Sequence, residues 1–229
     1  MPTPYDNYYR AEWDLFIKNP QRATAKLAAV KGRPVKFVLD LGCGAGQELL
    51  PFVKEYNAFG VGLDISAEVG KVGRELFQTH AAQSRVNFIR GASDELPFLN
   101  ETVDVVISRL ALPFTNNRQT LGEISRVLKP TGLFFLKIQH PRYYLKRLLS
   151  GIKSGDLKTV DHALRVLVNG SIYFLSGYQP MNLILGRETF QTRWQLKKEL
   201  KPLGLSFLGE LPDSNPRTPS FVICKHPVL

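Results

Sequence analysis

The sequence contains little cysteine and no long apolar run. Cys43 and Cys224 are the two cysteines among 229 residues. They are too few for a disulfide framework and lack the spacing of metal ligands, so we expect no bound metal. No uninterrupted apolar stretch approaches the roughly 18 residues of a membrane span. Residues 1–14 carry acidic and aromatic side chains where a signal peptide has its apolar core. These absences predict a cytoplasmic protein without a transmembrane segment.

Positive charge exceeds negative charge, but only at the two ends of the chain. The net charge is +10, from 30 lysine and arginine residues against 20 aspartate and glutamate residues. Residues 1–37 hold seven basic and three acidic residues, residues 38–140 hold ten and eleven, and residues 141–229 hold thirteen and six. The basic ends indicate either an anionic substrate, nucleic acid or membrane surface as partner, or an ordinary solvated surface.

Short apolar runs alternate with helical stretches in the first two thirds of the chain. In each run, the residues that would face either side of a strand are apolar, as in strands that are covered on both faces. The runs are residues 35–41, 59–65, 86–91, 103–108 and 132–138. The last helical stretch between them is expected to end at Pro130, before a Thr-Gly turn. The alternation predicts an α/β fold with a Rossmann-like doubly wound parallel sheet.

The flanking segments have different patterns. Residues 8–30 are predicted to form an amphipathic helical segment. Residues 140–187 are too long for a simple connection and predict an inserted cap after the fifth strand, with a helix at about 156–168. A helix at about 188–202 should follow, and the runs 205–211 and 220–226 predict a closing hairpin.

The stretch VLDLGCGAGQ (38–47) places three glycines at alternate positions directly after a predicted strand. Ligands of doubly wound sheets lie at that edge, where the following helix presents free N–H groups. The spacing G-x-G-x-G with Gln47 does not fit the dinucleotide fingerprint, and a phosphate-binding G-x-x-x-x-G-K-[ST] is absent.

The stretch resembles motif I of class I S-adenosylmethionine-dependent methyltransferases. Further similarities follow in the family's order: an acid ending the second strand in GVGLDIS, GASDELPF (91–98), VDVVISRLALPF (103–114) and ISRVLKPTGLFFL (124–136). The resemblance implies one methyltransferase domain with a seven-stranded sheet whose last strand is antiparallel. Its expected parts are an N-terminal helical lid (1–34), a cofactor-binding core (35–139), the cap (140–187) and a C-terminal helix and hairpin (188–229).

The resemblance also implies S-adenosylmethionine as the cofactor and assigns its site. The implied cofactor-binding residues are Asp40, Gly42, Gly44, Gly46, Asp64, Ile65, Ala92, Ser93 and Arg109. The glycines let the backbone approach the methionine moiety, and Asp40 orients its ammonium group. Asp64 holds the ribose hydroxyls or, alternatively, caps the next helix. Ile65 packs on the adenine.

One position departs from the family pattern. Ala92 stands where the family has an acid that meets the adenine amino group, so the Ser93 N–H group and Asp94 are the remaining candidates, although Asp94 is equally suited to cap a helix. Arg109 faces the methionine end, the substrate or plain solvent. His140, after the fifth strand, is the candidate general base, and its alternative role is purely structural. Four N-terminal aromatic residues form a lid over the cofactor or fasten a helix to the core: Tyr5, Tyr8, Tyr9 and Trp13.

Together these features predict a methyltransferase that acts on a small or lipid-like, anionic acceptor. The mixture of apolar and basic residues in 140–187 fits such an acceptor, a membrane-surface contact or a dimer interface. An RNA methyltransferase that uses the basic ends is the alternative enzyme, less favoured because no RNA-binding module is recognisable. A cofactor-binding protein without catalysis is a third reading. The sequence leaves the oligomeric state open.

Overall fold

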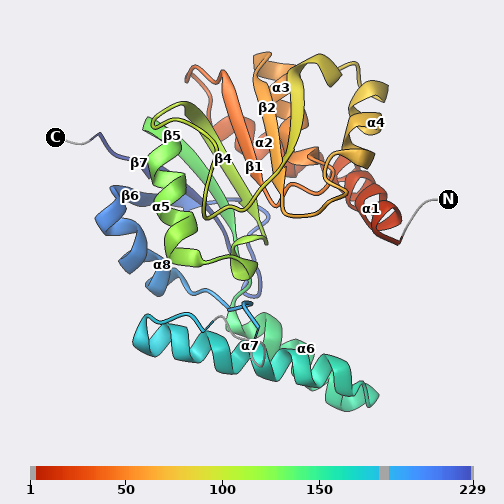
Figure 1. Cartoon of the computed structure of the whole chain (residues 1–229), viewed down its shortest axis with the longest axis vertical. Coiled ribbons are helices and arrows are strands. Elements are labelled where there is room, and N and C mark those ends of the chain that lie inside the picture. The colour runs from red at the N-terminus through yellow and green to blue at the C-terminus, as the bar shows by residue number, and fades with distance from the viewer. Residues whose placement is uncertain (1–3, 181–185, 228–229) are drawn as a thin grey trace.

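A seven-stranded sheet forms the centre of the molecule (Figure 1). The computed structural model describes residues 4–180 and 186–227. The strand order is β3-β2-β1-β4-β5-β7-β6, and β7 pairs antiparallel with both of its neighbours, β5 and β6, whereas the other neighbouring pairs are parallel. The strands are β1 Phe37–Leu41, β2 Phe59–Asp64, β3 Val86–Arg90, β4 Val103–Arg109, β5 Leu128–Lys137, β6 Leu205–Glu210 and β7 Ser220–Lys225. The predicted doubly wound sheet with an antiparallel last strand is confirmed.

Helices cover both faces of the sheet, which is why its strands are apolar on both alternations. On one face lie α1 (Pro4–Lys18), α2 (Pro20–Ala29), α3 (Leu50–Tyr56) and α4 (Lys71–Thr79). On the other lie α5 (Asn117–Val127) and α8 (Arg193–Leu200). In β1, Val38 packs into the first layer, whereas Leu39 and Leu41 pack into the second. Neighbouring residues of a single strand thus serve two separate cores.

The N-terminal segment forms two helices, because Pro20 ends the first and begins the second. Trp13 is buried and packs edge-on against Phe77 of α4 at a centroid distance of 5.2 Å. Arg10 pairs with Glu75 of α4 at 2.5 Å. These contacts fasten α1 to the core along its length.

Two helix boundaries differ from those predicted. The helix expected to reach Pro130 ends at Val127, and β5 begins at Leu128. Pairing passes from Val103–Leu128 to Val105–Leu133, so the Pro-Thr-Gly stretch forms a bulge within the strand instead of a turn before it. The helix expected from residue 188 begins at Arg193, where the Thr192 side chain caps its first turn.

The segment after β5 forms a helical hairpin, α6 (Pro141–Ser154) and α7 (Leu157–Ser176), which extends along one end of the molecule (Figure 1). Gly155 turns the chain with φ +70°, and Asp156 caps α7. The helix predicted at about 156–168 is present but continues to Ser176. Gly151 of α6 lies directly against Val160 and Thr159 of α7, so the two helices approach closely. No helix within the described residues has both the length and the apolar character needed to cross a membrane.

Candidate functional site

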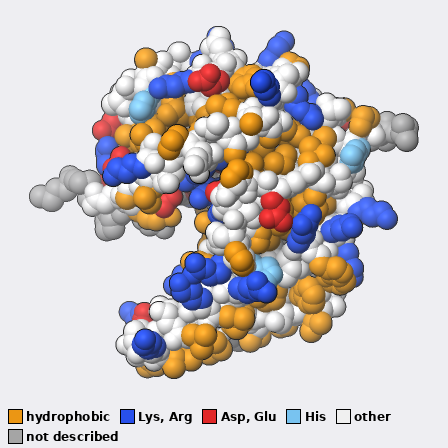
Figure 2. All heavy atoms as spheres, turned by 180° about the vertical axis from the view of Figure 1, so that it is seen from behind, with side chains coloured by type: hydrophobic (Ala, Val, Ile, Leu, Met, Phe, Trp, Pro, Cys, Tyr) orange, Lys and Arg blue, Asp and Glu red, His pale blue; other side chains and the backbone are white. Residues whose placement is uncertain are grey.

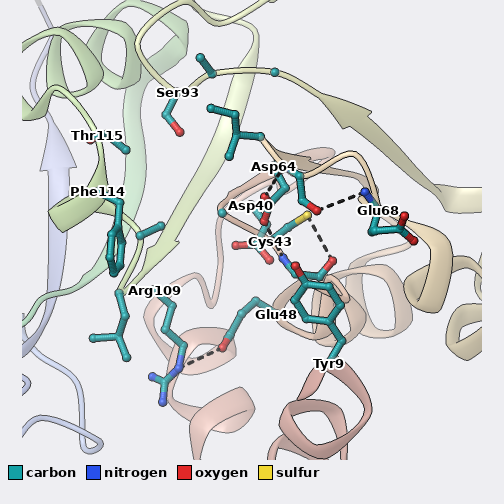
Figure 3. A pocket seen from close by; sticks show the side chains of 18 of the residues that line it. Tyr9, Asp40, Cys43, Glu48, Asp64, Glu68, Ser93, Arg109, Phe114 and Thr115 are labelled. Atoms are coloured by element: carbon teal, nitrogen blue, oxygen red, sulfur yellow. Dashed lines mark hydrogen bonds and ion pairs between the residues drawn. The ribbon is translucent and has the colours of Figure 1, made fainter. Parts of the chain in front are cut away.

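A cavity of about 800 Å³ opens at the carboxyl ends of β1, β2 and β4 (Figure 3). In the strand order of the sheet, β1 and β4 are neighbours, and the chain continues from β1 toward one half of the sheet and from β4 toward the other. Ligands of such folds usually bind at this position. Asp64 and Glu68 lie on one side of the cavity, and Phe114 and Thr115 lie on the other (Figure 3). The loops that follow three different strands therefore contribute to one site.

The glycine loop forms the floor of this cavity. Gly42 has φ +66°, and its N–H group donates to the Leu63 carbonyl at 2.8 Å. A Cβ atom at Gly42 would lie 2.4 Å from the Ala111 Cβ, and one at Gly44 would lie 3.1 Å from the Tyr9 ring. Glycine is therefore required here both for the left-handed backbone and for the close approach of neighbouring loops. Gly46 lies outside the described lining and packs against the Phe88 ring.

Asp64 follows β2 and fixes the shape of the loop opposite. One carboxylate oxygen accepts from the Gly44 N–H at 3.2 Å, and the other accepts from the Ser66 N–H at 2.9 Å. The next helix begins at Lys71, after an N-cap at Gly70, so Asp64 does not cap it. Ile65 lines the same part of the cavity and is 69% exposed. Its side chain offers an apolar surface for a flat ring.

Asp40 is buried at the end of β1 beside the glycine loop. Its Oδ2 atom has no hydrogen-bond partner within residues 4–180 and 186–227. Burial raises the pKa of Asp40 to about 7, although the nearby charges of Lys26 and Arg22 act in the opposite direction. Asp40 lines the cavity, and a carboxylate with an unpaired oxygen at such a place is suited to receive a cationic group.

Glu48 holds a buried cluster of cations behind the loop, and the sequence analysis did not identify it. Its carboxylate pairs with Arg22 and, at 2.7 Å, with Lys26. It also pairs with Arg109 at 3.7 Å, as Figure 3 shows. Burial and the neighbouring guanidinium of Arg22 lower the pKa of Lys26. The basic pair lies four residues apart on α2, and this spacing was the available signal for a shared acidic partner.

Arg109 links this cluster to the loop between β6 and β7. Its guanidinium pairs with Asp213 at 2.6 Å, and Lys137 pairs with the same carboxylate at 2.9 Å. These two cations hold the pKa of Asp213 well below its usual range, against the effect of burial. Arg109 lines the cavity as predicted, but its charge is already balanced by carboxylates. We conclude that it supports the wall of the site.

The third predicted motif also reaches the cavity. Ala92, Ser93 and Asp94 all line it, between the ends of β3 and β4. No helix begins at Asp94, so the alternative role of helix cap does not apply to it. Asp94 is therefore the remaining candidate for the role of the family's acid, in whose place this chain has Ala92.

His140 is placed away from the other candidate residues. It caps α6, with Nδ1 accepting from the Arg142 N–H at 3.3 Å. Among the described residues, those that line the cavity do not include His140. Its role as a general base stays a prediction.

The N-terminal helix contributes to the cavity wall through Tyr8, Tyr9 and Glu12. Trp13 packs inward and fastens the helix, whereas the role of the tyrosines as a lid stays a prediction. Tyr5 has no described side chain. Two further lining residues, Glu12 and Arg187, were not identified from the sequence. Arg187 follows the α6–α7 hairpin in the sequence.

Comparisons with known proteins agree with this geometry. Residues 38–132 match a protein-family model described as a methyltransferase domain. The chain is 35% identical over 130 residues to an uncharacterized protein of Methanocaldococcus jannaschii, covering 56% of this chain and 47% of that protein. It is 32% identical over 140 residues to a ubiquinone/menaquinone biosynthesis C-methyltransferase of Shewanella pealeana, covering 56% of each. The matches span about half the length of these relatives.

Among solved structures, the fold is similar to a chain from the complex between the Haloferax volcanii Trm112 methyltransferase activator and the putative methyltransferase. The TM-score is 0.66 at 18% identity, covering 98% of this chain and 97% of that chain. At this identity the likeness shows the fold alone. It extends beyond residues 38–132 and includes the segments on both sides of the matched domain.

Proposed function

We propose that the chain transfers a methyl group from S-adenosylmethionine to a small or lipid-like acceptor, because residues 38–132 match a methyltransferase domain and the sheet has the strand order expected of a class I S-adenosylmethionine-dependent methyltransferase. The observation that carries this proposal is Asp40, which lines the cavity beside the glycine loop and whose buried Oδ2 atom has no hydrogen-bond partner among the described residues. The cofactor has a cationic amino group and a cationic sulfonium. A nicotinamide dinucleotide would instead bring two phosphates to this carboxylate.

The charges of the lining fit the same cofactor. The described lining contains more carboxylates than guanidinium groups; the carboxylates are Glu12, Asp40, Glu48, Asp64, Glu68 and Asp94. Asp64 is placed to accept hydrogen bonds from ribose hydroxyls, because its carboxylate remains partly exposed while two N–H groups fix its orientation. Ile65 would contact the adenine, with Ala92 and Ser93 at its edge.

The cofactor supplies both the methyl group and its leaving group, so the protein mainly has to orient the reactants and exclude water. Tyr8 and Tyr9 cover one side of the cavity and restrict access of water to the glycine loop. Phe114 and Thr115, after β4, form the opposite side, where the acceptor would lie. Arg187 is exposed there and has no carboxylate partner among the described residues, which favours an acceptor with a negative charge.

The proposal predicts that the protein binds S-adenosylmethionine and its demethylated product but no nicotinamide dinucleotide. Titration calorimetry with each compound measures this directly. Incubation of the protein and a labelled methyl donor with a total lipid extract and with bulk RNA then tests the acceptor class. Tight dinucleotide binding without binding of the sulfonium compound would contradict the assignment of the cofactor, and methylation of RNA alone would contradict the assignment of the acceptor.

Cofactor affinity should rise with pH because Asp40 must lose its proton to hold an ammonium group. Its pKa of about 7 leaves most molecules protonated at pH 6 and most ionised at pH 8. If only the ionised form binds well, ionisation of Asp40 by itself increases affinity about tenfold over this interval, and affinity falls again at higher pH, where the amino group of the cofactor loses its proton. Calorimetry across the pH range measures the rise. Asp40→Asn should bind more weakly and with little pH dependence, whereas a variant that keeps the wild-type profile would contradict the role of Asp40.

A further inference from the structure

The α6–α7 hairpin carries a row of exposed aliphatic side chains, which we call the outer hairpin face. Every member is more than a third exposed, and Leu175 reaches 82%. The members are Leu145, Leu149 and Ile152 of α6 and Leu157, Leu164, Val168, Ile172 and Leu175 of α7. A surface with this many exposed aliphatic groups on one element is unusual for a protein that has no partner.

The spacing of these residues places them along one side of each helix. On α7 they recur at intervals of seven, four, four and three residues, which is one stripe about 27 Å long. The residues that each helix buries, among them Tyr144 on α6 and Val166 and Tyr173 on α7, lie on the opposite side, toward the rest of the molecule. Figure 2 shows hydrophobic side chains gathered along the end of the molecule formed by the hairpin.

Basic side chains flank this apolar face. Residues 141–178 contain six basic and two acidic residues, a net charge of +4. Both acids are engaged, because Asp156 caps α7 and Asp161 pairs with Arg165 at 2.5 Å. The remaining cations have no carboxylate partner in the part of the chain that the structure describes. The exposed ones are Arg142, Lys146, Lys153 and Lys158.

We propose that the outer hairpin face binds the surface of an anionic lipid bilayer, with α6 and α7 lying in the plane of the interface. Aliphatic residues enter the boundary between headgroups and acyl chains, and the flanking lysines and Arg142 contact anionic headgroups. Both features of the face are satisfied by such a surface, which offers an apolar layer beneath a negative one.

Charge complementarity decides against a second copy of the chain and against RNA. A symmetric dimer through this face would bring two surfaces of net charge +4 together without acids to balance them. RNA would neutralise the lysines but would leave eight aliphatic side chains in water, and none of the eight residues that form the face is an aromatic residue on which a base can stack.

The test is sedimentation of the full chain with vesicles. Vesicles of phosphatidylcholine with an equal part of phosphatidylglycerol should bind the protein at least tenfold more strongly than vesicles of phosphatidylcholine alone, at low salt. Leu149→Glu/Leu175→Glu should reduce binding at least tenfold and leave the fold intact, because both side chains are exposed. The matched control is Leu99→Glu/Leu208→Glu, two exposed leucines outside the hairpin, which should bind as the wild type does.

A second pair of variants separates the electrostatic contribution. Lys146→Glu/Lys153→Glu should lose binding to anionic vesicles, and raising the salt concentration should release the wild type. The proposal is overturned if the wild type does not sediment with anionic vesicles. The same holds if the wild type fails to sediment with them but binds RNA. It is also overturned if the leucine variant sediments like the wild type. A wild-type dimer that the leucine variant converts to a monomer, without vesicle binding by either, would assign the face to a second copy.

Discussion

Replacing Asp64 with alanine is expected to weaken binding of S-adenosylmethionine by about 2–4 kcal/mol, which is roughly 30- to 1000-fold in affinity. The variant would lack the charge-assisted hydrogen bonds that the Asp64 carboxylate makes to two ribose hydroxyls. The variant would also lack the hydrogen bond that the Gly44 N–H group donates to this carboxylate at 3.2 Å, so the glycine loop would be held less firmly. Titration calorimetry gives the change in affinity.

The control for this variant is Glu95→Ala, an exposed acid close to the third motif but outside the described lining. It changes the net charge by the same amount and should bind the cofactor as the wild type does. Thermal unfolding of both variants separates loss of the ligand contact from loss of the fold. A folded Asp64→Ala protein with normal affinity would show that the ribose is not held at the end of β2.

Glu48→Gln is expected to destabilise the folded protein by about 3–5 kcal/mol, because it leaves buried cations without their shared counter-ion. The side chains of Glu48, Arg22 and Lys26 are all less than 10% exposed. For a domain of this size the midpoint of thermal unfolding should fall by about 6–20 °C. Differential scanning calorimetry measures the shift.

Two further variants show whether the burial of the cluster is the cause. Glu48→Gln/Lys26→Met removes one of the unpaired cations and should recover part of the lost stability. Glu75→Gln breaks the exposed pair with Arg10, at 2.5 Å, and should change stability by less than about 1 kcal/mol. If Glu48→Gln is as mild as Glu75→Gln, the cluster does not contribute to stability as proposed.

Local sequence patterns were sufficient to predict the sheet and the side of the cavity that the glycine loop forms. The glycines, Asp40 and Asp64 lie within a few residues of strand ends, and strand ends are marked by apolar runs and glycine. Parallel strands then bring these short segments to a common edge without further information. The terminal hairpin was predictable for a similar reason, since two short runs rich in apolar residues surround a polar loop.

The rest of the site depends on contacts between distant parts of the chain. Glu48 is a single acid within an apolar stretch, and its partners Arg22 and Lys26 lie more than 20 residues earlier. Arg187 reaches the cavity only because the hairpin returns the chain to the sheet. Sequence spacing does not determine such long-range placements. His140 is a different case, because a local hydrogen bond to the backbone of Arg142 makes it a helix cap.

The position of β7 has a consequence for how the protein is made. All six of its residues are buried between β5 and β6, although β7 emerges from the ribosome more than 80 residues after β5. At about 5–20 residues translated per second, one edge of β5 therefore stays unpaired for about 4–17 s. During this time the nascent chain exposes unpaired backbone groups beside an apolar strand, so binding by a chaperone should be most needed then. Only when β7 is inserted does the loop that carries Asp213 reach Arg109 and Lys137 and complete the wall of the cavity.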